Sequence, residues 1–287
     1  MPLTFTLLGL SAIAAWGAAA GPARWREWPW RLILLASGIA AIHEGFMGWR
    51  GVPVAVALWM SAHLYQQADQ YRWRLVWGAA ALLLAVALAT HRLPGFAPHV
   101  VAQGIRLSAA SAQMTLEANY DKAFAGVLLL AYLCLRARTR SDWLYAIGMG
   151  LLVGAASATV VIGLAIAIGA VRYDPKLASI TPAWMAINLV LTCLFEEALF
   201  RGVIQDRLAR MVAERPRWRW LPLVAASVLF GLAHAGGGPT LIVVATIAGI
   251  GYGVAYAMTG RIEAAIVAHF TLNSIHFLGF TYPYAVR

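Results

Sequence analysis

Apolar runs of nearly membrane-spanning length recur along the whole chain, and this feature constrains the fold more than any other. A helix that crosses the ~30 Å hydrocarbon core of a bilayer needs ~20 mostly apolar residues. The chain is 61% hydrophobic and 12% charged, with a mean hydropathy of +0.71. The runs lack the alternation of apolar and polar residues that marks membrane β-strands. The sequence therefore predicts an all-α, polytopic transmembrane helix bundle.

We expect about 8–10 spanning helices and distinguish ten apolar segments. The segments are about 3–20, 32–49, 52–68, 75–91, 122–135, 143–171, 183–205, 220–235, 240–258 and 262–280. The fifth is short, and we expect its helix to begin before Asp121. The longest polar interval, 92–121, divides the chain into two predicted domains. Residues 1–118 form an N-terminal membrane-spanning extension of about four helices, and residues 119–287 form the second domain.

The net charge of +10 raises the possibility of a nucleic-acid partner, which the placement of the charges excludes. The arginines are spread over short loops, and no element carries them as one stripe. The loop 207–219 alone contains five arginines, and such loops face the cytoplasm by the positive-inside rule. We expect a multi-pass protein of a bacterial inner (plasma) membrane, in contact with the lipid bilayer. The sequence does not indicate an oligomeric state.

The segment 183–205 carries the pattern Glu196-Glu197-x-x-x-Arg201. Glu197 and Arg201 are four residues apart, so they share a helix face and can pair. Glu196 is rotated by about 100° from this face and is left free to face a water-filled cavity. A carboxylate in that position suits a general base. The alternative is an ion network that only holds the helices together.

Two later apolar segments each carry a histidine in a four-residue pattern. Phe230-x-x-x-His234 ends the segment 220–235, and glycines and Pro239 follow it. His269-x-x-x-Asn273 lies in the last segment, and both side chains can donate a hydrogen bond to a developing oxyanion. The alternatives are a hydrogen-bonded core histidine at 234 and a polar contact between helices at 269 and 273.

These three motifs, in this order and each in its own apolar helix, resemble those of the CPBP family of intramembrane proteases. That family includes the type II CAAX prenyl endopeptidases and is also called the glutamic intramembrane proteases. The resemblance covers about residues 180–280. The stretch 119–126 also resembles a segment of family members tied to bacterial C-terminal sorting systems.

The resemblance implies a role for each motif residue. Glu196 corresponds to the water-activating glutamate and His234 to its partner histidine. His269 and Asn273 correspond to the pair that stabilises the oxyanion. The supporting residues of the first motif are Glu197 and Arg201. The implied enzyme hydrolyses a peptide bond of a membrane-bound or lipid-anchored protein, with C-terminal processing or sorting as one possible task.

Three alternatives remain open at this point. A zinc enzyme would use Glu196, His234 and His269 as ligands, since three protein ligands and a water form a usual catalytic zinc site. We favour a reaction without a cofactor, because Asn273 and the second acid then have roles. Buried Glu, His and Arg residues also form proton relays in transporters. A scaffold or maturation factor with an inactive site is the third alternative.

Overall fold

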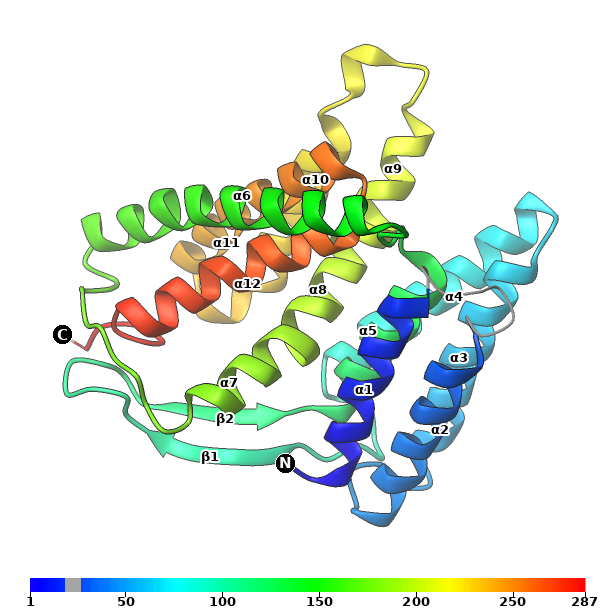
Figure 1. Cartoon of the computed structure of the whole chain (residues 1–287), viewed down its shortest axis with the longest axis horizontal. Helices are drawn as coiled ribbons and strands as arrows, with labels where there is room; N and C mark the ends of the chain where they lie inside the picture. The colour runs from blue at the N-terminus through cyan, green and yellow to red at the C-terminus, as the bar shows by residue number, and fades with distance from the viewer. Residues whose placement is uncertain (19–26, 287) are drawn as a thin grey trace.

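The computed structural model describes residues 1–18 and 27–286 (Figure 1). Four helices open the chain and surround a fifth. They are α1 (Leu3–Ala18), α2 (Trp28–His43), α3 (Gly51–Gln67) and α4 (Tyr71–Ala89). The fifth, α5 (Tyr120–Leu133), packs against α1, α3 and α4, and Lys122 is its only residue that is not buried. As expected, α5 begins before Asp121. The helix thus joins the N-terminal group to the rest of the bundle.

The other helices form a second group around the C-terminal motifs. The long helices α6 (Arg140–Ala167), α11 (Pro239–Thr259) and α12 (Ile262–Gly279) pack against one another, and α10 (Leu221–Ala233) packs on α11. Close contact between α6 and α12 depends on Gly154, where a Cβ atom would lie 2.7 Å from the Ala268 carbonyl oxygen. Small residues allow such approach between helices in membrane bundles.

One continuous helix, residues 181–211, runs between these two groups and carries the first motif. It consists of α7 (Thr181–Ile187), α8 (Leu194–Glu197) and α9 (Asp206–Met211), which are joined by two π-helical stretches, Asn188–Cys193 and Ala198–Gln205. π-Helical turns are rare and are often found at functional sites. The hydropathy pattern predicted the helix but not these turns, which place both glutamates in one α-helical turn between two wider ones.

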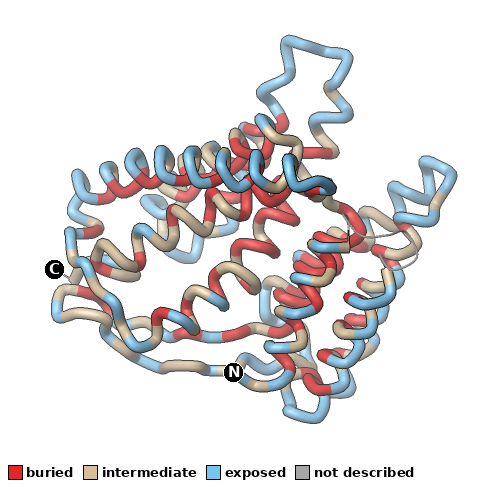
Figure 2. The backbone as a smooth tube through the Cα atoms, viewed as in Figure 1, coloured by how far each residue is buried: buried red, intermediate tan, exposed pale blue. Residues whose placement is uncertain are grey.

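The surface of the bundle supports its place in a membrane. In the described part of the chain, four helices are long and apolar enough to cross a bilayer: 71–89, 140–167, 181–211 and 239–259. Exposed residues follow the outer face of α6 in Figure 2, and they include Leu151, Leu152 and Val160. A lipid environment removes the cost of such exposure. The polytopic all-α class is confirmed, and a total of 8–10 spans remains a prediction.

The interval 92–121 differs from the sequence-based expectation, because it forms a β-hairpin and not only a polar linker. Strands β1 (His99–Ile105) and β2 (Met114–Ala118) pair antiparallel, with Val100 opposite Glu117. The hairpin escaped prediction because two register shifts interrupt its pairing and its strands are short. The predicted domain boundary at 118/119 falls between β2 and α5, and it remains a prediction.

Candidate active site

Glu197 and Arg201 form the predicted pair in the interior of the bundle. Both side chains are fully buried, and Arg201 Nε lies 3.1 Å from Glu197 Oε2. The two groups attract as ions, although their orientation is not that of an aligned hydrogen bond. Arg201 Nη2 also donates to the Gly249 carbonyl at 2.7 Å, and its guanidinium lies 4.8 Å from the ring centre of Phe230. The pair therefore links the long helix to α10 and α11.

Glu197 has a second partner that its helical spacing did not reveal. Its Oε1 atom lies 2.8 Å from Nδ1 of His269 on α12. Because the carboxylate accepts, Nδ1 donates, and the other ring nitrogen is free to act elsewhere. The imidazole also stacks on Tyr252, with ring centres 4.4 Å apart. These contacts fix the orientation of His269 and place its Nε2 atom 4.0 Å from Glu196 Oε2.

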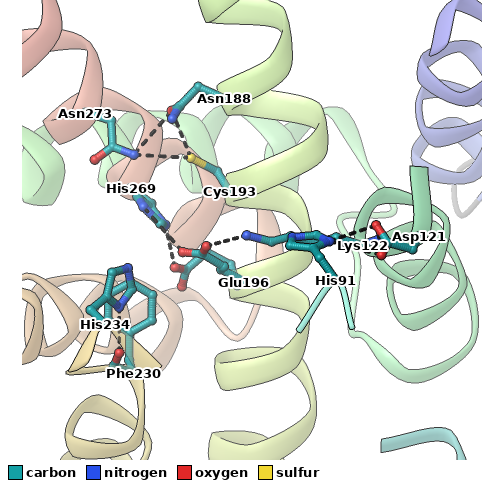
Figure 3. A network of polar contacts seen from close by, with 11 residues as sticks. His91, Asp121, Lys122, Asn188, Cys193, Glu196, Phe230, His234, His269 and Asn273 are labelled. Atoms are coloured by element: carbon teal, nitrogen blue, oxygen red, sulfur yellow. Dashed lines mark hydrogen bonds and ion pairs between the residues drawn. The ribbon is translucent and has the colours of Figure 1, made fainter. Parts of the chain in front are cut away.

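Glu196 is held by a residue that the motif analysis missed. Lys122 on α5 donates from Nζ to Glu196 Oε1 at 2.7 Å, across 74 residues of sequence (Figure 3). The preceding residue, Asp121, accepts a hydrogen bond from His91 Nδ1 at 3.0 Å. A lysine at the start of an apolar segment was the available signal, because such a charge needs a partner inside a membrane. The sequence could not say which acid that partner is.

Asn273 lies one turn after His269 and contacts a separate polar cluster. Its Nδ2 atom donates to Asn188 Oδ1 at 3.2 Å and approaches Cys193 Sγ at 3.8 Å. The second hydrogen bond ends on a thiol sulfur, which is a weak acceptor, so an oxyanion can replace it. In Figure 3, Asn273 and His234 lie on opposite sides of His269.

His234 ends α10 as predicted, but it makes no hydrogen bond or ion pair with Glu196 within the part of the chain that the structure describes. Its Nδ1 atom donates to the Phe230 carbonyl oxygen at 2.8 Å. In the neutral ring this leaves a lone pair on Nε2. The Phe230 ring centre lies 4.7 Å from that of His234 and 5.6 Å from that of His269. The motif phenylalanine thus contacts both histidines.

Two further expectations concern the surroundings of Glu196. We expected Glu196 to face a cavity, but Glu196 is not among the residues that line the nearby cavity, which Asn188 and Thr192 border eight and four residues before it. The Glu196 side chain is 12% exposed. Among the residues that the structure places, no group of three or more His, Cys, Asp or Glu side chains is arranged to hold a metal ion. The choice between the metal-free reaction and zinc held by Glu196, His234 and His269 stays a prediction.

Comparison with known proteins agrees with the motifs. Residues 178–275 match the family model described as Type II CAAX prenyl endopeptidase Rce1-like. No curated protein and no solved structure matches the chain. The matched region contains all three motifs. It includes the long helix, α10 and α11 in full and most of α12. The chain is therefore an integral membrane protein whose residues 178–275 are similar to the type II CAAX prenyl endopeptidases, as the motifs predicted.

Proposed function

We propose that this protein is an intramembrane endopeptidase of the glutamic type, which cleaves a membrane-bound or lipid-anchored protein. One observation carries the proposal. Glu196 lies in an apolar bundle between the ammonium group of Lys122 at 2.7 Å and the imidazole of His269 at 4.0 Å. Ionisable groups at such depth are expensive and are found mainly where a membrane protein has a functional site.

The reaction begins with a water beside the Glu196 carboxylate. Glu196 accepts a proton from the water as its oxygen attacks the peptide carbonyl carbon, and His234 Nε2 orients the water through its lone pair. The carbonyl oxygen becomes an oxyanion, to which protonated His269 and the Asn273 amide donate, the oxyanion taking the place of Cys193 as an acceptor. The protonated Glu196 then gives its proton to the leaving amine as the carbon–nitrogen bond breaks.

Glu197 and Lys122 prepare this geometry. Glu197 holds the His269 ring by its Nδ1 atom and favours the protonated imidazole that the oxyanion needs. Lys122 supplies the opposite charge beside Glu196 and restrains its carboxylate. The stretch that contains Lys122 is the one that resembles sorting-associated proteins, so C-terminal processing of membrane-anchored proteins in a bacterial inner membrane is the task we propose.

Comparative membrane proteomics of cells with wild-type protein and with Glu196→Gln tests the function. The amide keeps the shape of Glu196 and cannot serve as the base, so uncleaved precursors accumulate in the variant only. Glu214→Gln, which changes an exposed acid in the loop after α9, is the control and leaves the precursors processed. Normal processing in the Glu196→Gln cells contradicts the proposal. If that variant instead loses a proton or solute flux, the chain is a transporter.

Chelation tests the metal-free form of the reaction. Purified active protein keeps its peptidase activity after exhaustive treatment with a chelator, because Glu196 needs no metal to accept a proton. Elemental analysis then shows less than one zinc per protein. Loss of activity on chelation, with recovery on addition of zinc, would assign Glu196, His234 and His269 as metal ligands instead.

A further inference from the structure

A cavity of about 330 Å³ lies between β2 and the long helix, next to the candidate site. Four consecutive residues of β2 form one wall, from Met114 to Glu117. Trp184, Asn188 and Thr192 of the long helix form the opposite wall. This volume is at the lower end of the ~300–1,000 Å³ range of ligand pockets.

The edge of β2 that borders this cavity has unused main-chain groups. In Figure 1, β2 lies between β1 and α7, so its second edge faces the helix. Across the residues with a described position, β2 has no backbone hydrogen bond beyond its ladder with β1. A strand edge of this kind presents a row of free N–H and C=O groups that can pair with another extended chain.

Both walls of the cavity continue to the ion pair at Glu196. On the long helix, Thr192 borders the cavity and Glu196 follows four residues later, which is about 6 Å along the axis. Asn119, just before α5, borders the cavity, and Lys122 on α5 follows three residues later. An extended chain advances about 3.3 Å per residue, so two residues cover the step from the cavity to Glu196.

We infer that the free edge of β2 binds an extended segment of the protein substrate as an added strand and directs it to Glu196. The inference rests on the proposed function and adds how the substrate is held. Main-chain pairing at a sheet edge supplies affinity with little dependence on sequence, and pockets for alternate side chains supply selectivity. Such binding also unwinds the substrate, because a helix buries the peptide bond that the water must reach.

Photocrosslinking of the full-length Glu196→Gln protein in nanodiscs tests the inference without turnover. A benzophenone amino acid is placed at Thr115 or at Glu117, which both line the cavity. The matched control carries it at Val100, which is 44% exposed and pairs with Glu117 from the other strand. The probe is a fluorescent library of lipid-anchored decapeptides. We expect at least tenfold more crosslinked peptide at positions 115 and 117 than at position 100.

A second library tests the main-chain pairing itself. It has the same lipid and side chains, but each peptide amide is N-methylated and can no longer donate. One hydrogen bond contributes about fivefold to binding, so the loss of several should reduce crosslinking more than tenfold. Equal crosslinking by the methylated library, or full competition by the lipid anchor without a peptide, would show that the cavity holds side chains or an acyl chain and would overturn the inference.

Cleavage of the unmethylated library by wild-type protein separates the two proposals. Crosslinking at β2 without cleavage would support the inferred strand-addition site and contradict the proposed peptidase activity. Cleavage without crosslinking at Thr115 or Glu117 would support the proposed peptidase activity and overturn the inferred strand-addition site. If neither occurs, both are wrong.

Discussion

The two halves of the molecule bury different kinds of polar side chain. In the described part of α1–α4, the buried polar residues are hydroxyls, and each of the three serines bonds a backbone carbonyl: Ser11, Ser37 and Ser61. From α5 onward the buried set includes both signs of charge. These charged or ionisable residues are Asp121, Glu197, Arg201, Asp206, Glu263 and His269.

The acids of the N-terminal half stay at helix ends. Glu44 accepts bonds from the backbone N–H groups of Leu3 and Thr4, each at 3.1 Å, and so completes the start of α1. A carboxylate is favourable at a helix N-terminus, where free N–H groups and the helix dipole meet it. The contrast shows that the N-terminal half uses charge to join helices, whereas the C-terminal half buries charged groups, among them Glu197 and His269 beside Glu196.

The sharpest test of this contrast compares two ion pairs of identical spacing. Arg201→Ala removes the arginine partner of the fully buried Glu197 and should lower the free energy of unfolding by about 3–5 kcal/mol. Arg31→Ala removes the partner of Glu27, four residues earlier, whose side chain is 38% exposed; a surface pair contributes about 1 kcal/mol or less. Denaturation of both variants in mild detergent, followed by circular dichroism, measures the difference.

If Arg201→Ala and Arg31→Ala lower the free energy of unfolding equally, burial of charge does not distinguish the two halves. Arg201→Ala that stays fully folded but inactive would give the pair a role in chemistry rather than in stability.

The next largest effect concerns catalysis. Asn273→Ala should reduce the rate of peptide cleavage by about 10²–10³, the usual loss for one oxyanion donor, with little change in the melting temperature. Ser37→Ala in the N-terminal half should do the reverse: it loses the bond to the Thr4 carbonyl, costs about 1 kcal/mol of stability and leaves the rate unchanged. A rate loss below about threefold for Asn273→Ala would remove it from the reaction.

A third prediction concerns Lys122, which joins the halves. Lys122→Met removes the cation beside Glu196 and should lower kcat by about 10–100-fold, since a charged hydrogen bond contributes about 1.5–3 kcal/mol. Lys122→Arg should restore much of the rate, because it returns the charge. His91→Ala is the control. It removes the hydrogen-bond partner of Asp121, the neighbour of Lys122, and leaves the Lys122–Glu196 contact intact. If Lys122→Arg binds substrate as tightly as wild type but does not recover kcat, an electrostatic role of Lys122 is contradicted.

Local patterns carried the predictions that the structure confirms. The four-residue step from Glu197 to Arg201 fixes a shared helix face, and hydropathy alone locates α5 and the long helix. The contacts that escaped prediction join distant residues: Lys122 with Glu196, and Glu197 with His269 across 72 residues. No helical period encodes such pairs, because they depend on how whole helices pack. The hairpin was missed because its strands are short and irregularly paired.

The smallest expected effect lies at the loop that joins β1 to β2. Ser108 Oγ donates to Asp174 Oδ2 at 2.5 Å, and this bond holds the pKa of the Asp174 carboxyl below its usual value. Because the folded pKa is lowered, the stabilisation is complete above the unfolded value of about 3.9 and disappears as the pH falls through the folded pKa.

Ser108→Ala should therefore speed hydrogen exchange of the β1 and β2 amides at pH 7 by about fivefold, for one lost bond of about 1 kcal/mol. The difference from wild type should shrink as the pH falls through the folded pKa, because Asp174 is then protonated in both proteins. Thr90→Ala, which removes an exposed hydroxyl at the end of α4, should leave exchange in the hairpin unchanged. If Ser108→Ala and Thr90→Ala behave alike at pH 7, the anchoring of the hairpin does not depend on Asp174.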